Sequence, residues 1–158
     1  MERQKQVHRV FLVVVDQSPE LKVALRFAAR RARATGGRVA MLYVTEPAEA
    51  EWLGVGDIMR EERRAEAEQR LQELSTMVQE LSGEMPVLYV REGTVREELL
   101  RLIDEEPSIS ILVLGADTST GGPGPLVTAL TGKFLGKLTI PLTIVPGSFN
   151  DAEVDAIT

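Results

Sequence analysis

The chain has 158 residues, enough for one domain with a sizeable core, and its net charge of −6 argues against nucleic acid as the main partner. Cysteine is absent, which excludes disulfides and thiolate metal sites and fits the cytoplasm, where we expect the protein to work. No apolar run approaches the roughly 18–20 residues that a membrane span needs, so we expect no membrane partner.

The first unit of the chain is a strand, a tight turn and a helix. The run Val10–Val15 is unbroken and β-favouring, which is typical of a strand that is covered on both faces. Asp16 ends this run abruptly. Ser18 is placed to cap the helix that follows, with Pro19 at the first helical position, and Gly36 ends that helix.

The same alternation continues in the middle of the chain. The run Val39–Val44 predicts a second buried strand, and a long charged helix follows over about Asp57–Leu81. The third strand is Val87–Val90. Thr94 and Glu97 have the spacing of a capping box, in which each side chain binds the main chain of the other residue, and they predict the start of the next helix.

The last third of the chain adds two strands and a helix. Ile109–Leu114 is the fourth predicted strand, and a helix is expected near Leu126–Leu138. Thr139–Val145 is the fifth predicted strand. Pro141 lies inside it, and because proline cannot donate to a sheet, this favours an edge position or the first residues of a strand.

Alternating strands and helices predict an α/β fold. We expect a Rossmann-like domain with an open, doubly wound, five-stranded parallel sheet and helices on both faces. This single domain covers residues 1–147, and the polar, acidic residues 148–158 are expected to form a frayed tail or a small appendage. Ligands of such sheets bind beyond the carboxyl ends of the strands, where the strand order reverses, which directs attention to Asp16 and Gly115.

The segment GADTSTGGPGPLVTALTGK, residues 115–133, is the part of the chain richest in glycine. Glycines let main-chain N–H groups approach a phosphate closely, and the start of a helix adds donors and a positive dipole end. The same composition also suits a plain connection between a strand and a helix. The segment therefore leaves two classes open, a nucleotide-binding protein and a protein that acts through its surfaces.

Five short segments lie at or next to the predicted strands. They are VVVDQS at 13–18, MLYVTEP at 41–47, VREG at 90–93, LVLG at 112–115 and TIPLTIVPG at 139–147. In this order and spacing they resemble the universal stress protein family, over about Val10–Gly147. The resemblance implies strand order 3-2-1-4-5, in the adenine nucleotide alpha hydrolase-like group of folds. It also implies a homodimer that pairs through the last strand, Thr139–Val145.

Nucleotide-binding members of that family carry the motif G-x2-G-x9-G-[ST] after the fourth strand. By this resemblance, Asp16 and the main chain at Val44 hold the adenine and ribose of ATP or AMP. The glycine loop holds the phosphates, with Mg²⁺ if the ligand is ATP. Asp16 also has a structural interpretation, in which its carboxylate accepts hydrogen bonds from N–H groups of the turn that follows.

The glycine loop departs from the family motif. Gly115 matches the first glycine, but Thr118 stands where the second is expected. Gly122 and Gly132 have the x9 spacing, which implies a few inserted residues before them. Lys133 stands in place of the final hydroxyl residue.

Two interpretations of this altered loop remain. In one, the loop still binds a nucleotide and Lys133 offers a cation to the phosphates. In the other, the motif has decayed and the loop only connects two elements. Pro123 and Pro125 favour the second interpretation, because each removes a main-chain N–H from the region that would hold phosphate.

The sequence contains no His-paired nucleophile and no cluster of His and carboxylates for a metal, so we do not expect an enzyme. The resemblance implies a stress-response adaptor that acts as a dimer, with an unknown protein partner and a degraded site for ATP or AMP. Three alternatives stay open: a competent ATP-binding member with slow or no ATPase activity, an adaptor with an empty cleft, and a Rossmann-type enzyme with a flavin or nicotinamide cofactor.

Overall fold

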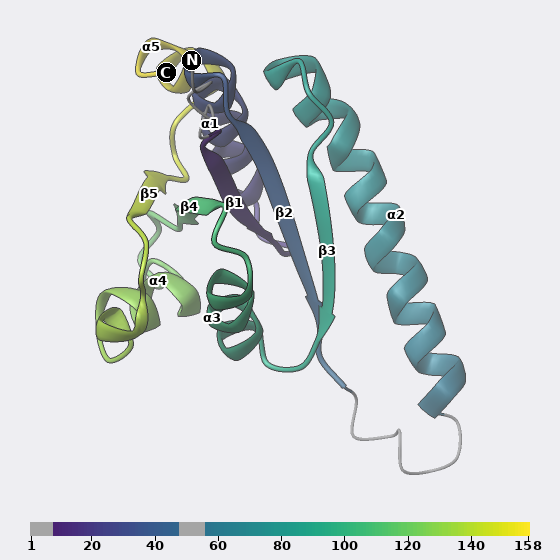
Figure 1. Cartoon of the computed structure of the whole chain (residues 1–158). Helices are drawn as coiled ribbons and strands as arrows, with labels where there is room; N and C mark the ends of the chain where they lie inside the picture. Colours follow the sequence, from purple (N-terminus) through teal and green to yellow (C-terminus); the bar gives the residue numbers. More distant parts are fainter. Residues whose placement is uncertain (1–7, 48–55) are drawn as a thin grey trace, which may run out of the picture.

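The computed structural model describes residues 8–47 and 56–158, and strands and helices alternate along them (Figure 1). The strands of these ranges are β1 (Val10–Val15), β2 (Arg38–Thr45), β3 (Val87–Glu92), β4 (Ile109–Ala116) and β5 (Leu142–Pro146). The helices are α1 (Glu20–Thr35), α2 (Gly56–Ser82), α3 (Val95–Glu105), α4 (Pro125–Thr131) and α5 (Asp151–Ala156), with a short 3-10 helix, η2 (Leu135–Lys137).

The strands form one parallel sheet in the order β3-β2-β1-β4-β5, so the expected order is confirmed. β1 is the central strand, and its pairing with β2 runs from Val10 and Arg38 to Val15 and Tyr43. On its other side β1 pairs with β4. The chain order reverses between β1 and β4, and a doubly wound sheet binds its ligands at such a switch point.

β5 lies at one edge of the sheet but begins later than expected. The strand starts at Leu142, so the prediction that it starts at Thr139 is wrong. Pro141 lacks an N–H and stays outside the strand, and its carbonyl accepts a hydrogen bond of 2.9 Å from the N–H of Leu112. The edge position that the proline suggested is confirmed.

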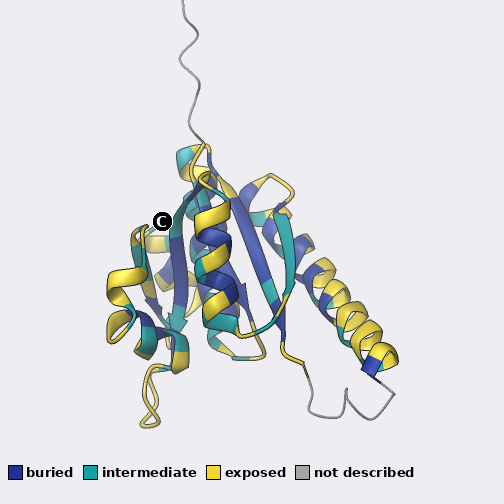
Figure 2. Ribbon diagram, turned by 60° about the horizontal axis from the view of Figure 1, so that its bottom comes forward, coloured by how far each residue is buried: buried dark blue, intermediate teal, exposed yellow. Residues whose placement is uncertain are grey.

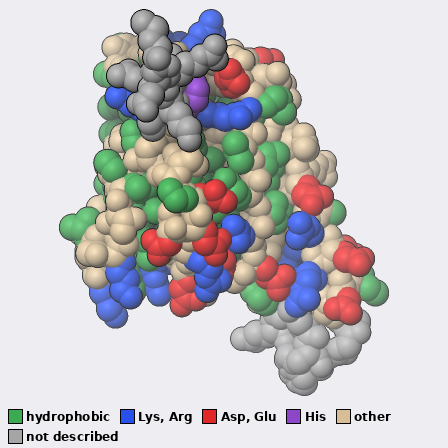
Figure 3. Space-filling model, in the orientation of Figure 1, with side chains coloured by type: hydrophobic (Ala, Val, Ile, Leu, Met, Phe, Trp, Pro, Cys, Tyr) green, Lys and Arg blue, Asp and Glu red, His purple; other side chains and the backbone are tan. Residues whose placement is uncertain are grey.

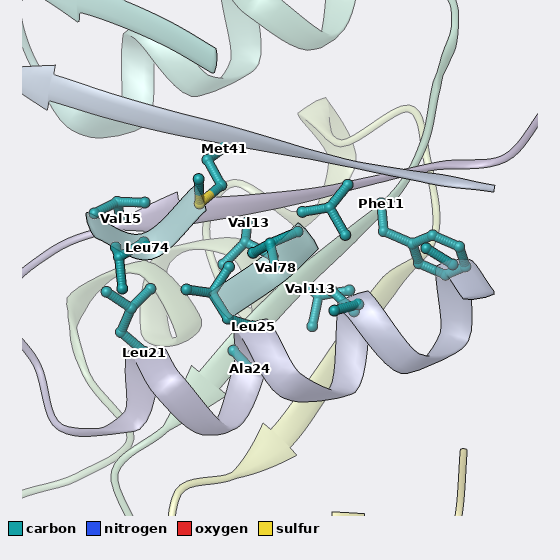
Figure 4. Close-up of a cluster of buried hydrophobic side chains, with 14 of the residues drawn as sticks. Phe11, Val13, Val15, Leu21, Ala24, Leu25, Met41, Leu74, Val78 and Val113 are labelled. Atoms are coloured by element: carbon teal, nitrogen blue, oxygen red, sulfur yellow. The ribbon is translucent and has the colours of Figure 1, made fainter. Parts of the chain in front are cut away.

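Alternate residues of the central strand face two separate cores. Phe11, Val13 and Val15 pack with α1 and α2 on one face of the sheet, as Figure 4 shows. Leu12 and Val14 pack with α3 and α4 on the other face. The central strands are therefore buried between helices whose outer faces are exposed (Figure 2). This double cover is the reason that β1 is an unbroken apolar run.

Two helices lack the side-chain caps that the sequence suggested. The hydroxyl of Ser18 donates a 2.7 Å hydrogen bond to Asp16 Oδ1 and does not cap α1. Hydrogen bonds to a carboxylate are among the stronger ones, so this bond fixes the orientation of the Ser18 side chain. Thr94 occupies the N-cap position of α3, but its side chain makes no cap hydrogen bond and lines a cavity instead.

The helix expected near Leu126–Leu138 is interrupted. α4 ends at Thr131, and η2 begins only at Leu135. Gly132 lies between them with φ −115° and ψ −115°, far from helical values. Phe134 therefore lies between α4 and η2, in neither helix. Its ring packs against the core on the α3 and α4 side.

Of the two expectations for residues 148–158, the frayed tail is wrong and the structure shows a small appendage. Residues 151–156 form α5, and a capping box between Asn150 and Glu153 closes its first turn. Val154 is only 1% exposed. Arg26 of α1 donates hydrogen bonds of 2.8 and 2.9 Å to the two carboxylate oxygens of Asp155. The acidic residues that suggested a solvated tail therefore dock α5 on α1.

The contact between Arg26 and Asp155 makes the stability of the protein depend on pH. The hydrogen bond from Arg26 lowers the pKa of Asp155 below its ordinary value of 3.8, against an opposing effect of desolvation. The stabilisation is therefore complete well above pH 3.8 and is lost as the pH falls through the lowered pKa of the folded state. We expect Asp155→Asn to lower the Tm at pH 7 and to have little effect in strong acid.

Thermal unfolding followed by circular dichroism between pH 7 and pH 2 measures this difference. Asp151→Asn is the matched control, because its carboxylate lies 3.6 Å from Arg26 but is 83% exposed, so its effect at pH 7 should be smaller. A Tm difference for Asp155→Asn that is the same at every pH would contradict the proposed role of this contact.

Candidate functional site

Two cavities open at the carboxyl ends of the strands, and they meet at Asp16. The β1/β2 cavity has a volume of about 610 Å³ and lies beyond the ends of β1 and β2, with walls from α2, α3 and α4. The β1/β4 cavity has a volume of about 340 Å³ and lies between the start of α1 and the loop after β4. Both volumes fall in the usual range for small-molecule sites.

Asp16 stands at the boundary between the two cavities. Its Oδ1 accepts hydrogen bonds from the N–H of Ser18 at 2.9 Å and from the hydroxyl of Ser18 at 2.7 Å. Asp16 therefore has the structural role that the sequence allowed, as an acceptor for the turn that follows β1. Within the described part of the chain, Oδ2 accepts no hydrogen bond, so one oxygen remains available to a ligand.

Val44 lies at the end of β2 and lines the β1/β2 cavity. Its side chain is 9% exposed and belongs to the core on the α3 and α4 side. The pairing of β2 with β1 ends at Tyr43 and Val15, so Val44 and Thr45 extend beyond the end of β1. The main chain of β2 therefore reaches the cavity on the side where β1 has already ended.

Gly115 is the last but one residue of β4 and lines the β1/β4 cavity. A Cβ at this position would lie 2.6 Å from the carbonyl oxygen of Glu20 and 2.7 Å from its Cβ. The start of α1 thus packs directly on the main chain of β4. This contact explains the glycine without any ligand.

Hydrogen bonds within the glycine loop after β4 fix its conformation. The N–H of Asp117 donates to the carbonyl of Pro123 at 3.2 Å, and Asp117 Oδ1 accepts from the N–H of Ser119 at 2.8 Å. Hydrogen bonds from the main chain and the side chain of Ser119 lower the pKa of Asp117, so the carboxylate form is favoured. Gly122 and Gly124 have φ values of +90° and +105°, a region that favours glycine.

Three of the predicted site residues line neither cavity: Gly122, Gly132 and Lys133. Gly122 shapes the loop, and Gly132 ends α4. The Nζ atom of Lys133 lies 5.5 Å from the centre of the Phe134 ring. The structure thus brings Asp16, Val44 and Gly115 together around the switch point and leaves the other three outside.

The two cavities differ in charge. The β1/β4 cavity is lined by the carboxylates of Asp16, Glu20 and Asp117, and its described lining contains no Lys or Arg. The lining of the β1/β2 cavity combines carboxylates with two guanidinium groups, those of Arg63 and Arg96. Acidic and basic side chains also lie next to one another on the lower part of the face in Figure 3.

Sequence reasoning missed Arg96 and Phe134. The guanidinium carbon of Arg96 lies 3.8 Å from the centre of the Phe134 ring, although the two residues are far apart in the sequence. Thr94 was interpreted only as a helix cap, yet it lines the β1/β2 cavity. No local motif marks this group, because it forms only when α3 and α4 pack on the same face of the sheet.

The residues that lie elsewhere limit the chemistry of the site. His8 precedes β1, at the opposite end of that strand, and its Nδ1 lies 2.9 Å from the carbonyl of Gly36. Among residues 8–47 and 56–158, no group of three or more His, Cys, Asp or Glu is arranged to hold a metal ion. The helices that the structure describes include none long and apolar enough to cross a membrane.

Comparisons with known proteins agree with this geometry. The model of the universal stress protein family matches residues 8–146. No curated protein sequence matches the chain. Among solved structures, universal stress protein UspA from Lactobacillus plantarum is 18% identical with a TM-score of 0.71, and the match covers 87% of this chain and 97% of that one. At this level of identity the likeness shows the fold.

Two further similar structures hold nucleotides. The universal stress protein from Archaeoglobus fulgidus in complex with dAMP is 17% identical, with a TM-score of 0.58 and coverage of 88% of this chain and 98% of that chain. A universal stress protein in complex with cAMP is 14% identical, with a TM-score of 0.60 and coverage of 89% and 98%.

The packing of Gly115 against α1 makes a prediction about stability. Gly115→Ala should lower the free energy of unfolding by about 1–3 kcal/mol, because the added methyl group would overlap the main chain of Glu20. Gly121→Ala is the control, since a Cβ there meets nothing within 4 Å and its effect should be close to zero. Urea unfolding of both variants measures the difference, and equal stabilities would contradict the packing role.

Proposed function

We propose that this chain, which belongs to the universal stress protein family, acts in a stress response as a homodimeric adaptor whose β1/β2 cavity binds an adenine mononucleotide. The observation that carries the proposal is this cavity of about 610 Å³, placed at the switch-point end of β1 and β2 and bordered by Asp16 and Val44. The absence of cysteine agrees with work in the cytoplasm.

Adenine and ribose fit the polar groups at this end of the sheet. Val44 and Thr45 extend past β1, so their main chain can pair with the edge of an adenine ring. Asp16 Oδ2 can accept a hydrogen bond from a ribose hydroxyl or from the adenine amino group, while Oδ1 holds the turn. The similar structures that hold cAMP and dAMP carry ligands of this class.

The altered glycine loop favours a monophosphate over ATP. A triphosphate laid along this loop would face Glu20 and Asp117 in the β1/β4 cavity, and like charges repel. Pro123 and Pro125 donate no hydrogen bond from their main chain. Lys133 lines neither cavity. The competent ATP-binding member, with Mg²⁺ on the phosphates, is therefore the second candidate.

We assign no catalytic role to the site. The described lining of the β1/β2 cavity has no His and no Lys, and its hydroxyl groups, those of Tyr43, Thr45 and Thr94, have no base of that kind to activate them. The ligand then serves as a signal that the protein reports to a partner.

The edge strand supports the dimer. β5 pairs with β4 on one side only, so its other side offers main-chain N–H and C=O groups to a second copy of the chain. Ile144 of β5 is 39% exposed, and Leu135, on the segment before β5, is 54% exposed. Pairing of two β5 strands would cover part of this apolar surface.

Calorimetric titration of adenosine, AMP and ATP tests the ligand proposal. We expect saturable heat with adenosine and with AMP, and at least about tenfold weaker binding of ATP, a difference of about 1.4 kcal/mol. Asp16→Asn should weaken adenosine and AMP alike, because its amide keeps one oxygen for the turn but replaces the free acceptor with a donor. Asp117→Asn, in the other cavity, should leave both unchanged.

Two results would overturn the ligand proposal. The first is no heat with adenosine or AMP at millimolar concentration. The second is ATP binding that is as tight as AMP binding and is weakened by Lys133→Ala, because the altered loop would then hold phosphates after all.

Light scattering tests the dimer. The chain has a mass of 17.4 kDa, and we expect twice this mass at micromolar concentration. Ile144→Lys should shift the mass to that of a monomer, because it places a charge on the pairing edge. Ile157→Lys is the control, since this residue is also exposed but lies after α5, away from β5, and its mass should stay doubled. A wild-type monomer at these concentrations would contradict the proposal.

A further inference from the structure

We infer that Arg96, stacked on the ring of Phe134, binds the phosphate of the ligand in the β1/β2 cavity and takes the place of the glycine loop. The inference rests on the proposed function, because it assigns the anionic end of the same ligand. It also names a binding residue on α3, where the sequence pattern had pointed to the loop after β4.

The position of Arg96 is fixed from two sides. It is the second residue of α3, and its guanidinium carbon lies 3.8 Å above the centre of the Phe134 ring. Phe134 in turn packs against the core on the α3 and α4 side. A cation stacked on an aromatic face keeps the N–H groups at its edge free for other partners. The side chain is thus oriented before any ligand arrives, which lowers the entropy cost of binding.

No carboxylate of the described residues forms an ion pair with Arg96. Within residues 8–47 and 56–158, the Phe134 ring is its sole side-chain partner, and it forms no ion pair. It is half-buried and lines the cavity. A partly desolvated guanidinium without a counter-ion is a strong site for a phosphate, which it can bind through two parallel N–H donors.

Two other residues of the lining can add to the binding of a phosphate. The Thr94 hydroxyl does not cap α3 and lines the same cavity, so it can donate one more hydrogen bond to a phosphate oxygen. Arg63 of α2 brings a second positive charge to the lining. The carboxylates of Asp16, Glu46 and Glu66 also border the cavity, so the lining as a whole suits one phosphate better than a chain of three.

The other cavity and the other nearby cation do not compete for this role. The described lining of the β1/β4 cavity carries carboxylates and no basic side chain. Lys133 also lies beside the Phe134 ring, with its Nζ atom 5.5 Å from the ring centre, but it lines neither cavity. Arg96 therefore faces the cavity and is held in place by the Phe134 ring, whereas Lys133 lies outside the cavity.

A stack of this kind can also serve stability alone, so the test must separate the two roles. Calorimetric titration with adenosine and with AMP does so, because the two ligands differ only in the phosphate. For the wild type we expect AMP to bind about tenfold more tightly than adenosine. Arg96→Gln should remove this difference and leave adenosine affinity and Tm unchanged. Phe134→Leu should weaken AMP by a smaller factor, because it loosens the arginine without removing it.

Lys133→Gln is the matched control, because it removes a cation beside the same ring but outside the cavity, and both affinities should stay as in the wild type. The pH dependence gives a second readout. AMP takes up a proton with a pKa near 6, so wild-type affinity should fall between pH 7 and pH 5, and Arg96→Gln should lose this dependence. Arg96→Lys, which keeps the charge but not the planar fork, should be intermediate.

The outcomes distinguish this inference from the proposed function. If adenosine binds but AMP binds no more tightly, or if Arg96→Gln weakens both ligands equally, the role of Arg96 is overturned and the nucleoside site stands. If the control Lys133→Gln weakens AMP as much as Arg96→Gln does, the phosphate site lies nearer the glycine loop and the inference fails. If neither ligand binds, the proposed function and the inference fall together.

Discussion

The first turn of α1 lies directly against the ends of β4 and β5, and this close approach requires a residue without a side chain at two positions. A Cβ at Gly115 would lie 2.6 Å from the carbonyl of Glu20, and a Cβ at Gly147 would overlap the Glu20 side chain and lie 2.7 Å from the carbonyl of Ala116. With α1 held there, Asp16 is fixed at the switch point where the two cavities meet. The glycine that suggested a phosphate loop therefore serves helix packing first.

The fold could be predicted because its strongest signals are local. The unbroken run of β1 indicates a strand covered on both faces, and the alternation of strands with helices indicates a parallel sheet. The errors lie where a partner outside the expected motif decides. The Ser18 hydroxyl donates to the carboxylate of Asp16, two residues before it, and does not cap the helix. Asp155 belongs to a docked helix because Arg26 of α1 donates a hydrogen bond to its carboxylate. The two residues are far apart in the sequence, so no local pattern around Asp155 indicates this contact.

The site was predictable only in part, for the same reason. Asp16 could be named because it follows β1, and ligands of a parallel sheet bind beyond such strand ends. Val44 was named through the family resemblance, and it lies at the end of β2. Arg96 and Phe134 meet because α3 and α4 cover the same face of the sheet. This contact needs the tertiary structure, and a family motif draws attention away from it, towards a loop that lines the acidic cavity.

The most direct test of the account is a map of where AMP contacts the protein. Titration of AMP into ¹⁵N-labelled protein, followed by amide chemical shifts, supplies that map at once for both candidate regions. The account predicts the largest changes at residues 44–46, at the end of β2, and 94–96, at the start of α3, with small changes at Gly121 and Gly122. The largest changes in residues 117–124, with none near Arg96, would contradict it and return the phosphate to the glycine loop.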